Sequence, residues 1–187
     1  MRLLLEPLAI RVAATHHTEA DAEKLRNLYD KWRTSQTRDV HGDEYDTANQ
    51  EFHFGLYGLD PTAEMKPFHA LLHRHWERYT RYRRVYYWRT ADFSQISGNH
   101  HLRLLEAWAT RDADRAEKLL AHHVLSAGCT LVHSLTAEGP AEYSPQLREV
   151  ADRYGCELED PAPHATGDSV GRQSADDRVE PFSGRFG

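Results

Sequence analysis

Apolar residues recur three and four positions apart through the first 136 residues, with almost no alternating run of β-branched residues. This spacing places apolar side chains on one face of an α-helix. Thr18 before Asp21, and Asp60 before Pro61, are typical of helix starts. The pattern predicts an all-α domain with helices at about 2–15, 19–35, 43–58, 62–89, 93–110 and 112–135.

The balance of charge divides the chain into two parts. Residues 1–136 contain 18 Lys and Arg against 18 Asp and Glu, whereas residues 137–187 contain 5 Arg against 11 acids. Twelve of the 13 histidines precede residue 137. We therefore predict a helical functional domain over 1–136 and an acidic tail over 137–187. The tail has one short helix at about 144–154 and is otherwise largely irregular, because it has few apolar residues to bury.

Composition argues against several classes of protein. No run approaches the roughly 18 apolar residues of a membrane helix, and the apolar opening is interrupted by Glu6 and Pro7, unlike a signal peptide. We expect a cytoplasmic protein with no membrane contact. The balanced charge of residues 1–136 lacks the basic surplus that phosphate neutralisation requires. We therefore expect no direct DNA binding by this chain alone.

Three histidines and an asparagine are spaced so that they can converge. Asn49 and His53 are four residues apart, hence on one face of a single helix. His101 and His123 lie at similar distances before and after the turn at about 109–112, so an antiparallel pair of helices brings them to nearly the same level. Three imidazoles and an amide oxygen form a coherent site for a divalent transition metal.

These segments also resemble a known family. The opening RLLLEPLAIRVAA, the EFH motif and HLRLLEAWATRDADRAEKLLAHHV resemble the C-terminal effector-binding domain (FCD) of FadR-type, GntR-family transcription regulators over about residues 1–136. The resemblance implies an antiparallel bundle of six to seven helices with a metal site inside it. Its metal ligands would be Asn49, His53, His101 and His123, with Asn49 where Asp is commoner. Two of these histidines belong to the adjacent pairs His100–His101 and His122–His123. The family's spacing to Ala107 and Asp112 selects the second histidine of each pair.

An uncompensated metal charge favours an anionic ligand, and the resemblance implies a small organic acid. The metal would be Zn²⁺, with Ni²⁺, Fe²⁺ or Mn²⁺ as alternatives. Arginine can hold a carboxylate through two parallel bonds. The segment HRHWERYTRYRR supplies four candidates to hold the far end of the acid: His75, Arg78, Arg81 and Tyr82. Aromatic packing and solvated helix faces also explain such a segment. His16 and His17, in the first loop, are expected to be solvated.

The family's DNA-binding winged helix is not present in this sequence. Four explanations of this difference from the family are possible: a trimmed chain, a misplaced start, a stand-alone sensor, or a bundle recruited to catalysis. The leading function is metal-dependent binding of a small carboxylate by a homodimer, and the alternative is a metalloenzyme on the same scaffold. No catalytic residue can be assigned; Asp46 and Glu51 are conceivable bases but are expected to be solvated charges.

Overall fold

The computed structural model of the chain describes residues 1–38, 42–58, 65–87, 93–135, 143–156 and 158. These residues form helices and connecting turns without any β-strand, which confirms the all-α prediction. The helices are α1 (Arg2–His16), α2 (Glu19–Arg38), α3 (Asp43–Leu56), α4 (Lys66–Tyr87), α5 (Phe93–Ala109), α6 (Ala113–Leu135) and α7 (Pro145–Arg153).

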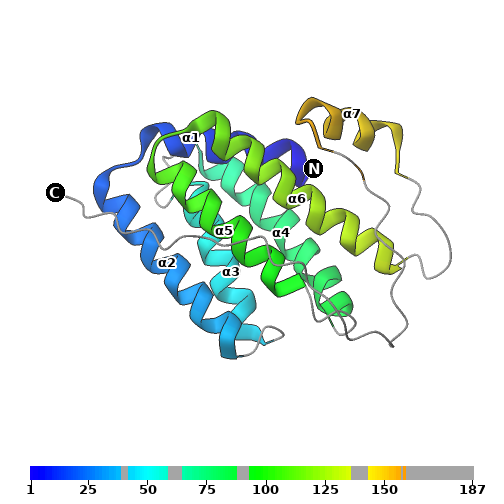
Figure 1. Cartoon of the computed structure of the whole chain (residues 1–187), viewed down its shortest axis with the longest axis horizontal. Coiled ribbons are helices and arrows are strands. Elements are labelled where there is room, and N and C mark those ends of the chain that lie inside the picture. Colours follow the sequence, from blue (N-terminus) through cyan, green and yellow to red (C-terminus); the bar gives the residue numbers. More distant parts are fainter. Residues whose placement is uncertain (39–41, 59–64, 88–92, 136–142, 157, 159–187) are drawn as a thin grey trace, which may run out of the picture.

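The helices pack as a bundle with α7 at one end (Figure 1). α1 packs mainly against α6, α2 packs against α3 and α5, and α5 packs against α6. α7 lies near the N-terminal end of α1 (Figure 1). Among the helices described, none combines the length and apolar character that crossing a bilayer requires.

Helix starts follow the local signals in the sequence where these can be seen. The backbone N–H of Thr18 donates to Asp21 (2.9 Å), and the backbone N–H of Asp21 donates to the Thr18 hydroxyl (3.2 Å). This reciprocal pair satisfies N–H groups that have no partner within the helix. Ser144 caps α7 by accepting from the N–H of Leu147. The predicted start at Asp60 and Pro61 lies outside the described residues.

A tight turn sets the register of α5 against α6. Arg111 has a left-handed φ of 59°, an uncommon conformation for a residue with a Cβ. Its guanidinium donates to the carbonyl oxygen of His17 (2.8 Å), while the N–H of Asp112 donates to the carbonyl of Ala107 (2.9 Å). The Asp112 side chain in turn accepts from the N–H of Arg115 (3.1 Å). These bonds hold α5 and α6 as an antiparallel hairpin.

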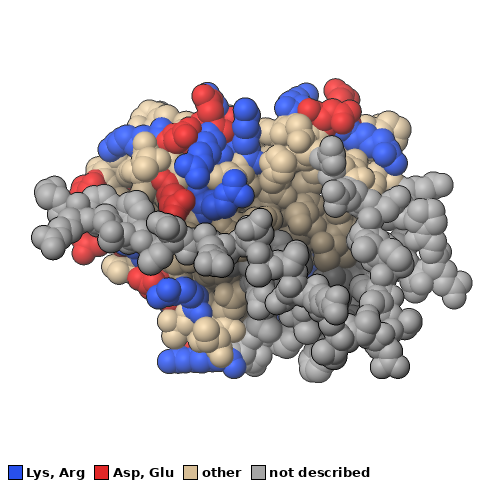
Figure 2. All heavy atoms as spheres, in the orientation of Figure 1, with Lys and Arg blue, Asp and Glu red and all other residues tan. Residues whose placement is uncertain are grey.

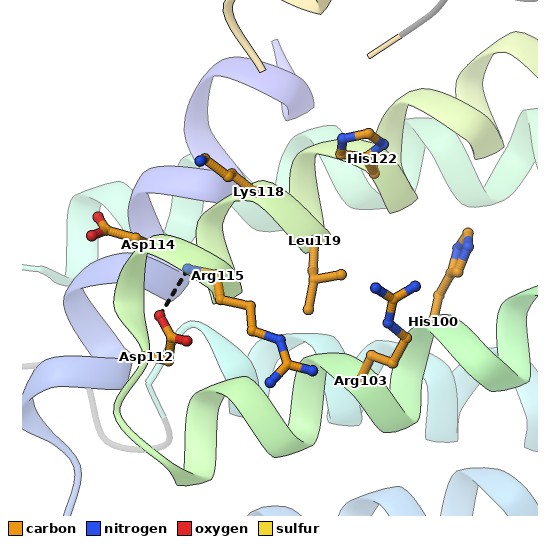
Figure 3. Close-up of a pocket in the computed structure, with 8 residues that line it drawn as sticks. All are labelled: His100, Arg103, Asp112, Asp114, Arg115, Lys118, Leu119 and His122. Carbon is orange, nitrogen blue, oxygen red and sulfur yellow. Dashed lines mark hydrogen bonds between the residues drawn. The ribbon is translucent and has the colours of Figure 1, made fainter. Parts of the chain in front are cut away.

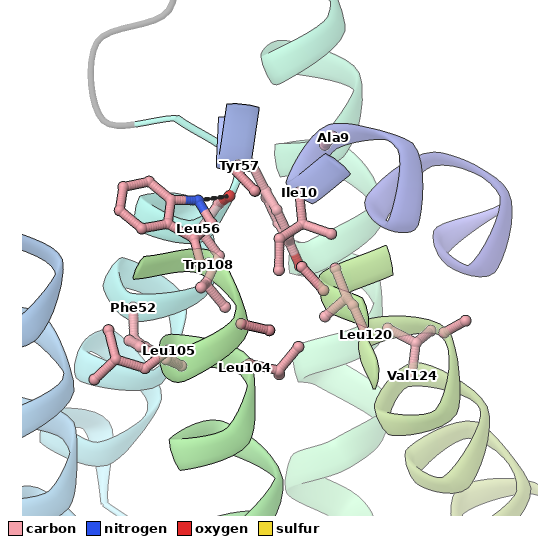
Figure 4. Packing of buried hydrophobic residues seen from close by; sticks show 14 of the residues in the cluster. Ala9, Ile10, Phe52, Leu56, Tyr57, Leu104, Leu105, Trp108, Leu120 and Val124 are labelled. Atoms are coloured by element: carbon pink, nitrogen blue, oxygen red, sulfur yellow. Dashed lines mark hydrogen bonds between the residues drawn. The ribbon is translucent and has the colours of Figure 1, made fainter. Parts of the chain in front are cut away.

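The inward faces of the helices form one hydrophobic core (Figure 4). Ile10, Phe52 and Leu104 are fully buried, and the indole N–H of Trp108 donates to the carbonyl oxygen of Leu56 (3.1 Å). The same core includes Ala151 of α7 and the nearby Cys156. The first part of the predicted tail therefore packs on the bundle. The division of the chain after residue 136 stays a prediction.

The two histidines at the end of α1 lie in different environments. His16 is exposed, as expected. His17 is buried and stacks on Trp108 with ring centroids 3.9 Å apart, so the expectation that it is solvated is wrong. The pattern of the sequence ends α1 near this point, but only the packing of α5 against α1 brings an indole over the imidazole.

Candidate metal centre

Three histidines from three helices meet inside the bundle. His53 comes from the last turn of α3, His101 from the middle of α5 and His123 from the middle of α6. Each side chain is buried, and one ligand nitrogen from each lies within 4.8 Å of the others. The group could hold a divalent metal ion.

The nitrogen positions match the needs of a single ion. Nε2 of His101 lies 3.1 Å from Nε2 of His53 and 3.4 Å from Nε2 of His123. Two nitrogens that each lie about 2.0–2.1 Å from a tetrahedral ion are about 3.3–3.4 Å apart. The two Nε2–Nε2 distances from His101 are therefore close to those between ligands of one ion, and the three histidines each place a ligand nitrogen within 4.8 Å of the others.

The surroundings keep these imidazoles neutral. Trp32 lies edge-on to His101 with ring centroids 4.2 Å apart, and Trp76 lies 4.8 Å from His53. Burial is the main cause that lowers the pKa of His101 to about 3 and the pKa values of His53 and His123 well below their usual range. A metal ligand must present an unprotonated nitrogen. The fold therefore holds the histidines in their ligating form near neutral pH.

A chain of hydrogen bonds leads from His53 to the start of α1. The hydroxyl of Tyr57 donates to Oε2 of Glu6 (2.7 Å) and lies 3.1 Å from Nδ1 of His53. Glu6 is 1% exposed and forms an ion pair with Arg2 (2.5 Å), whose guanidinium also lies over the rings of Trp76 and Tyr79. Burial raises the pKa of Tyr57 well above its usual value, so its hydroxyl keeps its proton.

This chain selects the tautomer of His53. Tyr57 has one hydroxyl proton and gives it to Glu6, so the hydrogen bond to His53 must come from Nδ1–H. Nε2 of His53 is then the nitrogen that carries the lone pair, and it points at His101. Partners of this kind orient metal-binding histidines and raise their basicity.

The predicted fourth ligand lies on the expected helix face. Asn49 precedes His53 by one turn of α3, and its side chain is buried. Its role as a metal ligand stays a prediction.

The predicted carboxylate-binding residues of α4 lie away from its inward face, on which Leu72, Trp76 and Arg83 are buried. A hollow of about 400 Å³ between the start of α1, α4 and α6 is lined by, among others, three of the four predicted residues: His75, Arg78 and Tyr82. The fourth, Arg81, is exposed and does not line it. Their role in ligand binding stays a prediction.

The two conceivable bases are both held by cations. Asp46 is buried and pairs with Arg83 and Arg84, so the expectation that it is a solvated charge is wrong. Glu51 is 40% exposed and pairs with Lys31 (2.5 Å), in agreement with the expectation. Neither carboxylate belongs to the three-histidine group.

Sequence reasoning missed Arg2, Glu6, Tyr57 and Arg83 as neighbours of the centre. A signal existed for Tyr57, because it follows His53 by four residues and so shares its helix face. A second signal existed for Glu6, since a carboxylate stands among the apolar residues of α1. No sequence pattern indicates that α1 places Glu6 against α3, which only the packing of the bundle decides.

Comparison with known proteins gives one result that covers the site. The family model described as the FCD domain matches residues 1–126, which include all three histidines of the centre. No curated protein and no solved structure matches the chain.

Proposed function

This chain belongs to the FCD-domain family, consistent with the effector-binding domain of GntR-family regulators, and on that premise we propose that it binds a small carboxylate through a divalent metal. The observation that carries the proposal is the convergence of three buried, neutral imidazole Nε2 atoms from α3, α5 and α6. His53, His101 and His123 would hold the ion, with Asn49 as a fourth ligand. The function is sensing: the acid binds and is released unchanged.

The donor set supports a borderline transition metal. Imidazole nitrogens suit Zn²⁺, Ni²⁺ and Fe²⁺, and an amide oxygen is also acceptable to Mn²⁺. Tetrahedral geometry with nitrogen ligands is typical of zinc. We propose Zn²⁺ as the resident ion, with Ni²⁺, Fe²⁺ and Mn²⁺ as the ions to compare.

The charges around the centre support an anionic ligand. Three imidazoles and an amide carry no charge, so a bound dication would be uncompensated and would attract an oxygen anion into a remaining coordination position. A small carboxylate has the charge and the oxygen donors that such a field favours.

The ion pairs of the nearby carboxylates favour sensing over catalysis. A general base must be free to accept a proton from the substrate. Asp46 is instead enclosed by Arg83 and Arg84, and Glu51 pairs with Lys31 at the surface. Glu6, the carboxylate linked to His53 through Tyr57, is likewise held by Arg2 and by the Tyr57 hydroxyl.

Elemental analysis and thermal unfolding of the purified chain test this proposal. We expect a divalent ion at near one equivalent, and stabilisation by lactate only in the metal-loaded protein. Binding at 100 times the dissociation constant should add about 2.7 kcal/mol. Mass spectrometry should recover the acid unchanged. If the protein neither contains nor binds Zn²⁺ or Ni²⁺, the proposed metal site is refuted. If the acid is consumed, the proposed sensing function is refuted.

The family assignment also motivates two expectations about the setting. We propose that the chain acts in the cytoplasm, where a transcription regulator meets its effector, and that it forms a homodimer. Sedimentation at tens of micromolar protein tests the second expectation, and a monomer at that concentration would contradict it.

A further inference from the structure

The outer side of the α5–α6 hairpin carries a second hollow, and the ring of His100 at its end lies 5.7 Å from the ring of His123 of the metal centre. Its volume is about 520 Å³, within the usual range for small-ligand sites. Figure 3 shows it between the two helices. The lining comprises His100 and Arg103 of α5, the turn residue Asp112, and residues of α6, namely Asp114, Arg115, Lys118, Leu119 and His122.

Two guanidinium groups converge in this groove. Arg103 from α5 and Arg115 from α6 point into the space between the helices, on either side of Leu119 (Figure 3). Figure 2 shows Lys and Arg side chains over this part of the molecule, with Asp and Glu side chains among them. Both groups carry a positive charge, which favours an anion in the space between the helices.

The acidic residues at the groove are engaged elsewhere. Asp112 caps α6 by accepting from the N–H of Arg115, and Asp114 pairs with Arg11 of α1. Glu106 reaches Arg115 only at 3.9 Å and is 53% exposed, which makes that pair weak. Within the described part of the chain, Arg103 and Lys118 form no ion pair. Among the lining residues, three cations (Arg103, Arg115 and Lys118) stand against two carboxylates (Asp112 and Asp114), so the cations are in excess by one.

The remaining features of the groove suit a compact anion. Arginine presents parallel N–H groups that match the oxygens of a carboxylate or a phosphate. His100 and His122 close the end farthest from the turn and can donate further hydrogen bonds.

We propose that this groove is a second ligand site, separate from the metal centre, that binds a small oxyanion with two or more negative charges. Arg103 and Arg115 hold the oxyanion from opposite helices, and Leu119 forms the apolar floor between them. The site does not depend on a bound metal, because no residue of the three-histidine group lines it.

Calorimetric titration of the full chain with inorganic phosphate and with citrate, in chloride buffer, tests the proposal. We expect saturable binding of at least one anion with a dissociation constant of about 1 mM or below. The double variant Arg103→Gln/Arg115→Gln should weaken it at least tenfold, because charge-assisted bonds from two guanidinium groups are lost. The matched control Arg26→Gln/Arg33→Gln removes the same charge from the exposed side of α2 and should stay within a factor of two.

The outcomes separate the possible binding modes. Preference for phosphate assigns a tetrahedral oxyanion to the groove, and preference for citrate assigns a polycarboxylate. No saturation below about 10 mM, or equal binding by the groove variant, would overturn the proposal, since the anion would then bind weakly or at the metal centre. If the groove variant does not fold, amide chemical shifts of the unchanged chain decide. Changes must then map to Arg103, Arg115 and Leu119, and changes confined to the metal centre would refute the site.

Discussion

The α5–α6 hairpin carries one pair of histidines on its inner face and one pair on its outer face. Each inner histidine follows an outer one directly in the sequence. On the inner face, His101 and His123 are buried among aromatic rings and meet His53. On the outer face, His100 is half-buried, His122 is exposed, and both line the cationic groove. One step along a helix turns a side chain by about 100°. The comparison teaches that this rotation separates a dehydrated histidine of the candidate metal centre from one that lines the outer groove.

Exchange of the two pairs for alanine gives the largest expected difference. His101→Ala/His123→Ala removes two of three imidazole ligands, so Zn²⁺ affinity should fall by about 10³-fold or more. The matched control His100→Ala/His122→Ala should stay within about threefold. Competition titration with a chromogenic chelator measures both. If the inner variant does not fold, His123→Gln replaces it. Equal losses from the two pairs would mean that the metal is not held on the inner face.

The pH dependence of stability should also differ between the two faces in metal-stripped protein. A histidine that stays neutral in the fold but has an ordinary pKa near 6.5 when unfolded costs about 1.4 kcal/mol of stability for each pH unit below 6.5. The lowered pKa values of His101 and His123 therefore leave stability unaffected above about pH 6.5 and reduce it progressively as the pH falls below 6.5, because only the unfolded chain then takes up these protons.

Urea unfolding at pH 5.5 and at pH 4.5 checks this dependence. The variant His101→Ala/His123→Ala should lose about 2.7 kcal/mol less than the parent chain over this interval. The variant His100→Ala/His122→Ala should retain most of the parent's dependence, although burial and then Arg103 also lower the pKa of His100. A parent chain whose stability does not change over the interval would show that the inner histidines are protonated or hydrated in the fold.

Removal of the Tyr57 hydroxyl tests whether the hydrogen-bond chain to Glu6 orients His53 on the inner face. Tyr57→Phe leaves Nδ1–H of His53 and the buried carboxylate of Glu6 without their shared partner. Loss of such a partner typically lowers metal affinity by about 10–100-fold. The control Tyr154→Phe removes a hydroxyl that contacts Glu117 far from the three histidines and should leave metal affinity unchanged. Unchanged affinity in Tyr57→Phe would show that the chain to Glu6 does not orient the ligand.

Deletion of residues 159–187 should have the smallest effect. Their composition, rich in Gly, Pro, Ser and Asp, offers little apolar surface to bury. We expect the unfolding midpoint to shift by no more than about 2 °C, because the loss corresponds to well under 1 kcal/mol. Both faces of the hairpin should keep their ligand affinities. A larger shift would show that residues 159–187 also pack on the bundle.

The sequence by itself determined the helices and their order. Apolar spacing and cap residues predict each helix, and the structure places them within a few residues of the predicted bounds, where these are described. The resemblance to the family, through its spacing to Ala107 and Asp112, indicated which histidine of each pair lies on the inner side. Helix bounds depend on geometry that repeats along one helix, so they can be predicted without knowing which other helix packs against it.

Tertiary structure alone decided which side chains from other helices complete each face. Glu6 of α1 meets Tyr57 only because α1 crosses the end of α3, and Arg83 rather than Arg81 is the arginine of α4 that is buried near His101. The charge of the outer groove likewise depends on Arg11 of α1, which engages Asp114. A sequence fixes angles about its own helix axes, but the rotation and crossing of one helix against another follow from the packing of the whole core.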